Sequence, residues 1–207
     1  MRTVSASVGS VIFGLTHQEM IHGDVKPQNV LIFKQEAWKL EPELIYAKLG
    51  DFGYSGWNMD PATNVTLHLP RSRQWDAPEY HHHAFRINEA KQLDIFSLGI
   101  VCLWFLFHDK MASLQFAPQQ KSSSVGISAR LRSLCTENAL EDIKIVEELK
   151  YEGLLPILAR ELIRSDNSLS EVEAEKLEIF LSSALCQDPH ERALLLEQLA
   201  PLTGYET

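Results

Sequence analysis

The apolar positions along the chain predict a mainly helical protein. The longest apolar run, residues 95–107, contains Ser97 and Gly99 and is too short to cross a bilayer, so we expect a helix buried in a protein core. Residues 4–20 carry apolar side chains at roughly helical spacing, which predicts a helix at the start of the chain. From Asp94 onward the pattern stays helical.

A further amphipathic helix is predicted near the end of the chain. Ser170 and Glu173 have the spacing of a capping box, in which each side chain bonds the backbone N–H of the other residue. Pro189 is expected to end this helix, and a short helix is expected over residues 192–199. The apolar stripe behind the capping box consists of Val172, Leu177, Phe180, Leu181, Ala184 and Leu185.

Two short apolar segments predict a β-hairpin. Residues 30–33 and 47–52 have the character of strands, and the connection between them is polar. Residues 24–29 form a loop in front of the first strand, because Pro27 lacks a backbone donor and disfavours a helical residue before it. Residues 53–79 show no period, so we expect a long irregular segment, which in a compact domain is usually functional or disordered.

The composition is that of one soluble globular domain. The chain has 207 residues, of which 45% are hydrophobic and 23% charged. Its net charge of -9 argues against a nucleic-acid surface, and no segment predicts a membrane anchor. The three widely spaced cysteines, without a C-x-x-C, favour reduced thiols and an intracellular location, in the cytoplasm or nucleus.

The negative charge is concentrated in one region. Residues 137–178 hold twelve acidic against five basic residues, so seven of the nine net negative charges lie there. A solvated helical face is the ordinary interpretation, and an acidic docking surface is the alternative.

A cluster of polar residues in front of the first strand points to phosphoryl transfer. Asp24 and Asn29 lie five positions apart on the loop, and the predicted hairpin would bring Asn29 close to Asp51. An amide oxygen and a carboxylate suit Mg²⁺, which usually keeps water and substrate phosphates as its other ligands. Lys26 supplies a positive charge for the transferred phosphate, and Asp24 can accept a proton from an incoming hydroxyl. Gly53 would permit the sharp turn that follows Asp51.

Five motifs in the same order resemble the eukaryotic protein kinases. H-G-D-V-K-P-Q-N at residues 22–29 resembles the family's catalytic loop, and D-F-G at residues 51–53 its metal-binding motif. A-P-E at residues 77–79 resembles the end of the activation segment. Asp94 resembles the aspartate that begins the central helix of the large lobe, and Arg192, in D-P-H-E-R, a late structural arginine.

The resemblance implies the large, C-terminal lobe of a Ser/Thr protein kinase. The implied fold is mainly α, with a short β-hairpin region carrying the catalytic loop and the D-F-G motif. Residues 53–79 would be the activation segment, and residues 110–170 would include a helical insertion. ATP and Mg²⁺ would be the cofactors, and Ser or Thr residues of a protein would be the substrate.

The resemblance also implies roles for the site residues. Asp24 would be the catalytic base, Lys26 would contact the γ-phosphate, and Asn29 and Asp51 would hold the metals. Leu31 would form the floor under the adenine.

Other residues would position the substrate or support the loop. Ser72 would be the hydroxyl beside the catalytic loop that favours Ser/Thr substrates, a preference to which Lys26 also points. The residues with structural roles would be His22, Asp94, and Glu79 paired with Arg192.

Two departures from the family pattern matter. Gly23 stands where most members have an arginine that gathers a phosphorylated activation segment, so we expect activity that does not depend on phosphorylation within residues 53–79. The sequence also contains no G-x-G-x-x-G loop and no V-A-I-K lysine, so we expect a truncated chain without the small lobe and with impaired ATP binding.

Two other functions stay open at this point. A binding or scaffold module is one, because of the acidic region. A small-molecule phosphotransferase is the other, because H-G-D is the usual spelling of the loop there; Lys26, Ser72 and A-P-E argue against it. The consecutive histidines at residues 81–83 are not expected to bind a metal, since adjacent side chains diverge.

Overall fold

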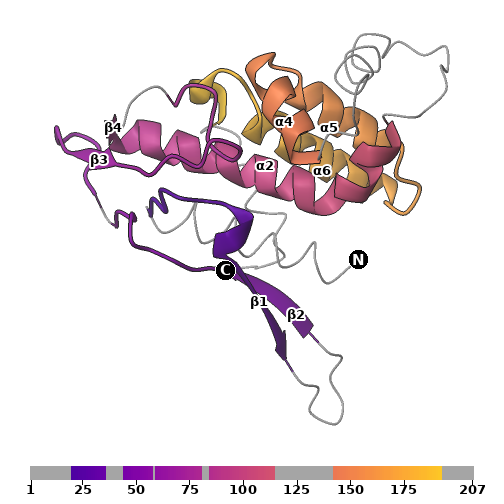
Figure 1. Cartoon of the computed structure of the whole chain (residues 1–207), viewed down its shortest axis with the longest axis horizontal. Coiled ribbons are helices and arrows are strands. Elements are labelled where there is room, and N and C mark those ends of the chain that lie inside the picture. Colours follow the sequence, from indigo (N-terminus) through magenta and orange to yellow (C-terminus); the bar gives the residue numbers. More distant parts are fainter. Residues whose placement is uncertain (1–19, 36–43, 58, 81–83, 115–141, 193–207) are drawn as a thin grey trace.

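The computed structural model of the chain describes residues 20–35, 44–57, 59–80, 84–114 and 142–192, and shows a helical body with a hairpin extending from it (Figure 1). These described residues form two antiparallel two-stranded sheets, followed by four α-helices. In order, the elements are the 3-10 helix η1 (Pro27–Asn29), β1 (Val30–Gln35), β2 (Leu44–Leu49), β3 (Thr66–His68), β4 (Ala84–Arg86), α2 (Ile87–Leu114), α4 (Asp142–Tyr151), α5 (Leu155–Arg164) and α6 (Glu171–Ala184).

Helix α2 is the core of the body, which confirms that residues 95–107 form a buried helix. The helix begins at Ile87, so the predicted start at Asp94 was wrong, and Asp94 lies about two turns inside it. The carboxylate of Glu89 accepts a hydrogen bond from the backbone N–H of Arg86 at 2.8 Å, which stabilises the earlier start. The stretch Ile87–Met111 could span a membrane by length and composition alone, yet 72% of its most apolar window is buried inside the protein.

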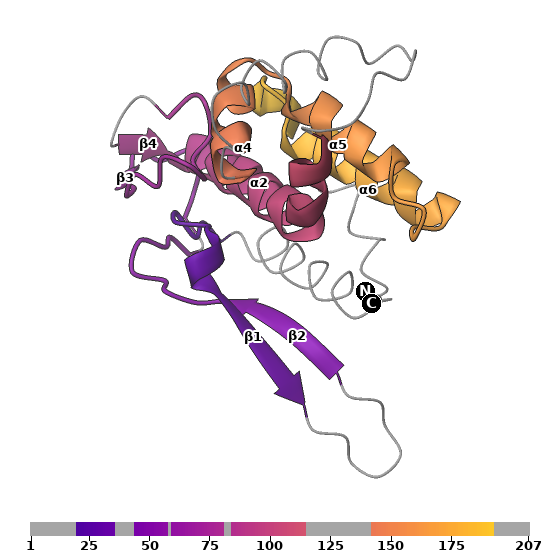
Figure 2. The same cartoon turned by 45° about the vertical axis from the view of Figure 1, so that its right-hand side comes forward.

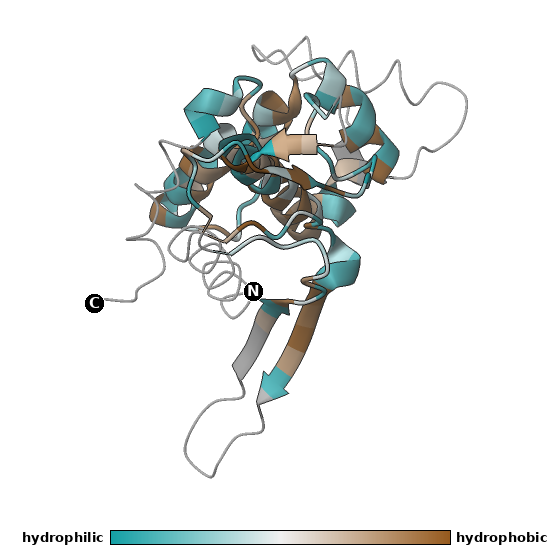
Figure 3. Ribbon diagram, turned by 90° about the vertical axis from the view of Figure 1, so that its left-hand side faces the viewer, coloured by the Kyte–Doolittle hydropathy of each residue, from teal (hydrophilic) through white to brown (hydrophobic). Residues whose placement is uncertain are grey.

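Helices α4, α5 and α6 pack against α2 and bury its apolar side chains. Figure 3 colours the ribbon by the hydropathy of each residue, with hydrophobic stretches in brown. The capping box of Ser170 and Glu173 is present at the start of α6, as predicted. Helix α6 ends at Ala184, and residues 189–192 are helical again. Pro189 therefore begins the next helical segment instead of ending α6, which suits a residue without a backbone N–H.

The predicted hairpin is present. Strands β1 and β2 pair antiparallel from Val30 opposite Leu49 to Gln35 opposite Leu44, and the hairpin points away from the helical body (Figures 1 and 2). The second strand ends at Leu49, so the prediction that it reaches residue 52 was wrong.

Residues 53–79 are not irregular throughout. Strand β3 pairs with β4, which lies outside this segment, and Leu67 stands opposite Phe85. A strand of three residues is too short to show a period, and its partner cannot be deduced from the segment alone.

Several predicted features fall outside the described residues. They are the helix over residues 4–19, the histidines at residues 81–83, most of the helix over residues 192–199, and residues 115–141 of the proposed insertion.

Candidate active site

The loop of residues 22–29 is held against α2 by a buried carboxylate. Asp94 accepts hydrogen bonds from the backbone N–H of His22 at 2.5 Å and of Gly23 at 2.9 Å. Burial raises the pKa of Asp94 to about 7, while the two backbone N–H groups act in the opposite direction. A carboxylate from the core helix thus fixes the start of the loop.

His22 supports the loop from inside. Its ring is fully buried, and Nε2 lies 2.9 Å from the carbonyl oxygen of Gly50. The backbone N–H of Asp24 donates to Nδ1 at 3.3 Å, so the network assigns the ring proton to Nε2. Burial lowers the pKa of His22, which favours this neutral form.

Asp24 is the centre of the site. Its carboxylate is buried and lies 2.6 Å from the Lys26 ammonium, while the Asn29 amide donates to its backbone carbonyl at 2.8 Å and to its carboxylate at 3.3 Å. The hydroxyl of Ser72, which is 48 residues away in the sequence, donates to the other carboxylate oxygen at 2.8 Å. The structure therefore brings together four of the residues that the sequence singled out.

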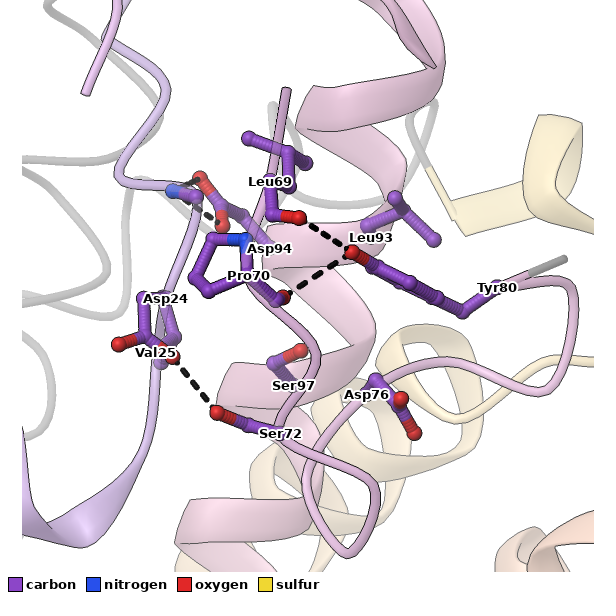
Figure 4. Close-up of a pocket in the computed structure, with 11 residues that line it drawn as sticks. Asp24, Val25, Leu69, Pro70, Ser72, Asp76, Tyr80, Leu93, Asp94 and Ser97 are labelled. Carbon is purple, nitrogen blue, oxygen red and sulfur yellow. Dashed lines mark hydrogen bonds between the residues drawn. The ribbon is translucent and has the colours of Figure 1, made fainter. Parts of the chain in front are cut away.

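A small pocket opens between the loop of residues 22–29 and the chain around Ser72 (Figure 4). The side chains of Asp24 and Ser72 point toward one another across it. The hydroxyl of Tyr80, which also lines the pocket, donates to the carbonyl oxygen of Leu69 at 2.6 Å and lies 3.1 Å from the carbonyl oxygen of Pro70. Tyr80 was not among the residues predicted from the sequence, although it directly follows A-P-E and belongs to the same segment.

Asn29 and Asp51 lie at the base of the hairpin, where the backbone N–H of Gly50 donates to the Asn29 carbonyl at 2.8 Å. Asn29 is buried and uses Nδ2 within the loop, so Oδ1 is the atom that a metal would use. The Asp51 side chain is exposed. Two hard oxygen donors fit Mg²⁺ with water and phosphate as its other ligands. Among the described residues, no cluster of three or more His, Cys, Asp or Glu side chains could hold a metal.

The turn after β2 differs from the prediction. The positive φ falls on Asp51, at 62°, and not on Gly53. A non-glycine residue in this conformation is uncommon and occurs often at functional sites.

Gly23 is enclosed by the segment that follows the D-F-G motif. Its φ is +79°, and an added Cβ would lie 2.8 Å from Leu69 Cδ2 and 2.9 Å from the carbonyl oxygen of Tyr54. The space that a side chain would enter is therefore already filled by residues 54 and 69.

Arg192 and Glu79 are paired, as the resemblance implies. Arg192 is fully buried and forms a two-pronged ion pair with the Glu79 carboxylate, in which Nη2 lies 3.0 Å from Oε2. Its Nε also donates to the carbonyl oxygen of Cys186 at 2.6 Å. The end of A-P-E is thus fixed to the chain after α6.

Leu31 lies on the exposed hairpin. Its side chain is 48% exposed, and a Cβ at Gly50 would lie 2.9 Å from its Cδ1. Leu31 thus covers the chain directly before Asp51.

Comparison with known proteins adds to this geometry. The sequence model of the family described as "Protein kinase domain" matches residues 1–200. The leucine-rich repeat receptor-like protein kinase PEPR1 of Arabidopsis thaliana is 29% identical over 175 residues, which are 84% of this chain and 13% of that protein. The serine/threonine-protein kinase/endoribonuclease IRE1 of Oryza sativa subsp. japonica is 37% identical over 100 residues, which are 46% of this chain and 10% of that protein. The chain thus spans about a tenth of the length of these curated relatives.

Proposed function

The chain belongs to the protein kinase domain family, and from this premise we propose that it carries the catalytic loop of a Ser/Thr protein kinase. The proposed reaction transfers the γ-phosphoryl group of Mg-ATP to a Ser or Thr hydroxyl of a protein. The observation that carries the proposal is the buried Asp24 carboxylate, held at 2.6 Å by Lys26 and at 2.8 Å by Ser72.

Asp24 is suited to orient an incoming hydroxyl and accept its proton. The Asn29 amide holds the backbone carbonyl of Asp24 in place, and the Asp24 carboxylate faces the pocket that the residues around Ser72 border. A substrate hydroxyl that enters here would compete with the Lys26 and Ser72 donors for the carboxylate oxygens. Lys26 would then be released toward the phosphate, where its charge stabilises the transfer.

Mg-ATP would bind on the hairpin side of Asp24. Asn29 Oδ1 and the Asp51 carboxylate would hold Mg²⁺, which neutralises charge on the phosphates when bound. Leu31 would lie beneath the adenine. The 207 residues contain no glycine-rich loop or V-A-I-K lysine to cover the nucleotide, so we propose weak ATP binding by this chain alone.

The two alternatives receive less support. The Ser72 hydroxyl contacts the proposed base, Asp24, and Ser72 belongs to the segment that we propose positions a peptide. A small-molecule phosphotransferase does not need such a segment. Part of the acidic region is used inside the chain, where Glu147 pairs with Arg73, Asp166 with Lys110, and Glu178 with Arg160. These internal pairs reduce the charge that would remain for docking.

The function is tested by radiolabelled phosphate transfer from Mg-ATP to dephosphorylated casein. The 207-residue chain is compared with the same chain fused behind the nucleotide-covering lobe of a related kinase. We expect transfer by the fusion, lost in its Asp24→Asn variant, and no transfer above background by the 207 residues alone. A fusion that binds Mg-ATP yet shows no transfer that depends on Asp24 would contradict the proposed function.

The metal donors are tested separately by nucleotide binding. Calorimetry of the fusion should show ATP affinity that rises with Mg²⁺, and Asp51→Asn should remove most of that dependence, because one charged ligand is lost. Robust transfer by the 207-residue chain would contradict the proposal that a cover is required.

A further inference from the structure

Helix α4 carries a lysine that is fully buried. Lys150 is 0% exposed and lies in the last turn of the helix. Its ammonium donates to the carbonyl oxygens of Arg73 at 2.7 Å and Asp76 at 2.8 Å, and to Asp76 Oδ1 at 3.0 Å. Burial lowers the pKa of Lys150, and the charge of Asp76 acts in the opposite direction. All three donors of the ammonium are therefore used on one short segment.

That segment is the turn that presents Ser72. The backbone N–H groups of Trp75 and Asp76 donate to the Ser72 carbonyl oxygen at 2.7 and 2.9 Å, which closes the turn of residues 72–76 (the Ser72 turn). The Ser72 hydroxyl leaves this turn toward Asp24. Lys150 holds the opposite side of the same turn. The turn that carries the hydroxyl is thus bonded to a helix residue that lies 74 positions after Asp76.

Neighbouring contacts hold the end of α4 around Lys150 in place. The side-chain amide of Gln187 donates to the Lys150 carbonyl at 2.7 Å, and Arg192 Nη2 donates to the Gln187 carbonyl at 3.2 Å. One turn earlier on α4, Glu147 pairs with Arg73 at 2.8 Å. Because Arg192 also holds Glu79, the chain on both sides of Ala77 is tied to one network.

The chemistry argues for a geometric role. A buried ion pair gains little stability over an apolar pair of similar volume, because both charges lose their hydration. An apolar side chain could fill the space but could not bond the backbone carbonyls of the turn. Two of the three hydrogen bonds of Lys150 go to those carbonyls, which fix backbone position.

We propose that Lys150 is a positioning residue, which holds the Ser72 turn so that the Ser72 hydroxyl reaches Asp24. The proposal deepens the proposed function and rests on it, since Asp24 is the proposed base. In the reaction, Lys150 would set the place of the peptide relative to Asp24 and would touch neither substrate nor ATP.

The test measures the NMR chemical shift of the Asp24 carboxyl carbon in selectively labelled wild type and variants at fixed pH. The Asp24→Asn variant assigns the signal. Ser72→Ala shows where the signal lies when the hydroxyl contact is lost. Lys150→Met removes the closer charged partner of the buried Asp76 carboxylate, which keeps Arg71 at 3.5 Å, and should lower the unfolding midpoint. The double variant Lys150→Met/Asp76→Leu removes both charges and should recover most of that midpoint. Lys144→Met, at an exposed position of α4, is the matched control.

We expect the Asp24 signal of the double variant to move more than half of the way toward its position in Ser72→Ala. Amide exchange at residues 75 and 76 should become about tenfold faster, while exchange in α2 is unchanged. A double variant whose midpoint recovers and whose Asp24 signal stays at the wild-type position would overturn the proposal and leave Lys150 a purely structural residue. A double variant that does not recover, with the signal unmoved in the folded protein, would overturn it equally.

The readout needs neither ATP nor substrate, so it separates the two proposals. Displaced signals together with a fusion that never transfers phosphate would contradict the proposed function and leave the placement of Ser72 by Lys150 standing. Phosphate transfer by the fusion, together with an Asp24 signal that does not move, would overturn the role of Lys150 and leave the proposed function standing.

Discussion

The two sides of Asp24 are built differently. On the proposed acceptor side, Ser72 belongs to a segment that the fully buried side chains of Lys150 and Arg192 tie to the helical body. On the proposed nucleotide side, the hairpin extends from the body, and Leu31 and Phe33 are 48% and 38% exposed. Within the described residues, the Ser72 side of Asp24 is thus fixed by buried charged contacts, and the hairpin side is partly exposed.

This difference shows what each half requires. An isolated two-stranded hairpin is marginally stable in water and gains stability from a covering partner. The helical body supplies its own core, and its charged residues contact backbone carbonyls that are distant in the sequence. We therefore expect variants on the acceptor side to change the stability of the chain, and variants on the hairpin to change binding alone.

The largest loss of stability from one substitution at a single pH is expected at Arg192. Arg192→Met leaves the Glu79 carboxylate and the Cys186 carbonyl without their donor, and should lower the free energy of unfolding by about 3 kcal/mol. Urea denaturation measures the loss. Arg164→Met, at an exposed position of α5, is the control and should change it by under about 0.5 kcal/mol. An equal loss in both variants would show that Arg192 does not anchor the acceptor side.

A smaller loss is expected at Gly23. Gly23→Ala combines a φ of +79° with contacts shorter than 3.0 Å to Leu69 and Tyr54, and should cost about 2 kcal/mol of unfolding free energy. Gly53→Ala is the matched control, because Gly53 lacks a positive φ and its Cβ would meet only Asp51 Oδ1 at 3.4 Å. We expect that control to change stability by under about 1 kcal/mol. If Gly23→Ala were as mild as Gly53→Ala, the segment would not pack on the loop in solution.

The pH dependence of stability should report on Asp94. Because its pKa is raised from 3.8 to about 7, the folded protein keeps a proton that the unfolded chain releases, and stability from Asp94 falls as pH rises from about 4 to 7. His22 acts oppositely: burial lowers its pKa, so its contribution is lost as pH falls below 6.5. The neighbouring charge of Asp24 also raises the pKa of Asp94.

Asp94→Asn removes the contribution of Asp94 to the pH dependence and keeps the contribution of His22. The stability difference between wild type and Asp94→Asn should therefore shrink by up to about 1.4 kcal/mol per pH unit between pH 4 and 7. Denaturation curves at four pH values measure it. A difference that is constant over this range would mean that the hydrogen bonds from His22 and Gly23 offset the effect of burial on the pKa of Asp94.

The smallest effect on stability is expected on the hairpin. Leu31→Ala should change the free energy of unfolding by under about 1 kcal/mol, because the side chain is already half exposed, yet should weaken Mg-ATP binding by the fusion. Ile32→Ala is the control on the opposite face of the strand and should change neither property. A large stability loss in Leu31→Ala would contradict the contrast between the two sides.

Part of the fold and of the site could be predicted because it is local in the sequence. The capping box, the apolar run in α2 and the two strands of the hairpin depend on spacing over a few residues. The bounds were less accurate: α2 begins before Asp94 because Glu89 caps it, and β3 is visible only through its pairing with β4. The ordered motifs brought attention to Asp24, Lys26, Asn29 and Ser72, whose roles remain predictions.

The sequence by itself determined the family and the local elements, since residue order and spacing produce the family match, the capping box of α6 and the apolar run of the core helix. The tertiary structure alone decided how they are held. It placed the Ser72 hydroxyl on Asp24, put the positive φ on Asp51, and brought Lys150 to the carbonyls of residues 73 and 76. The contacts of Ser72 and Lys150 join segments 48 or more residues apart, so no local spacing in the sequence specifies them.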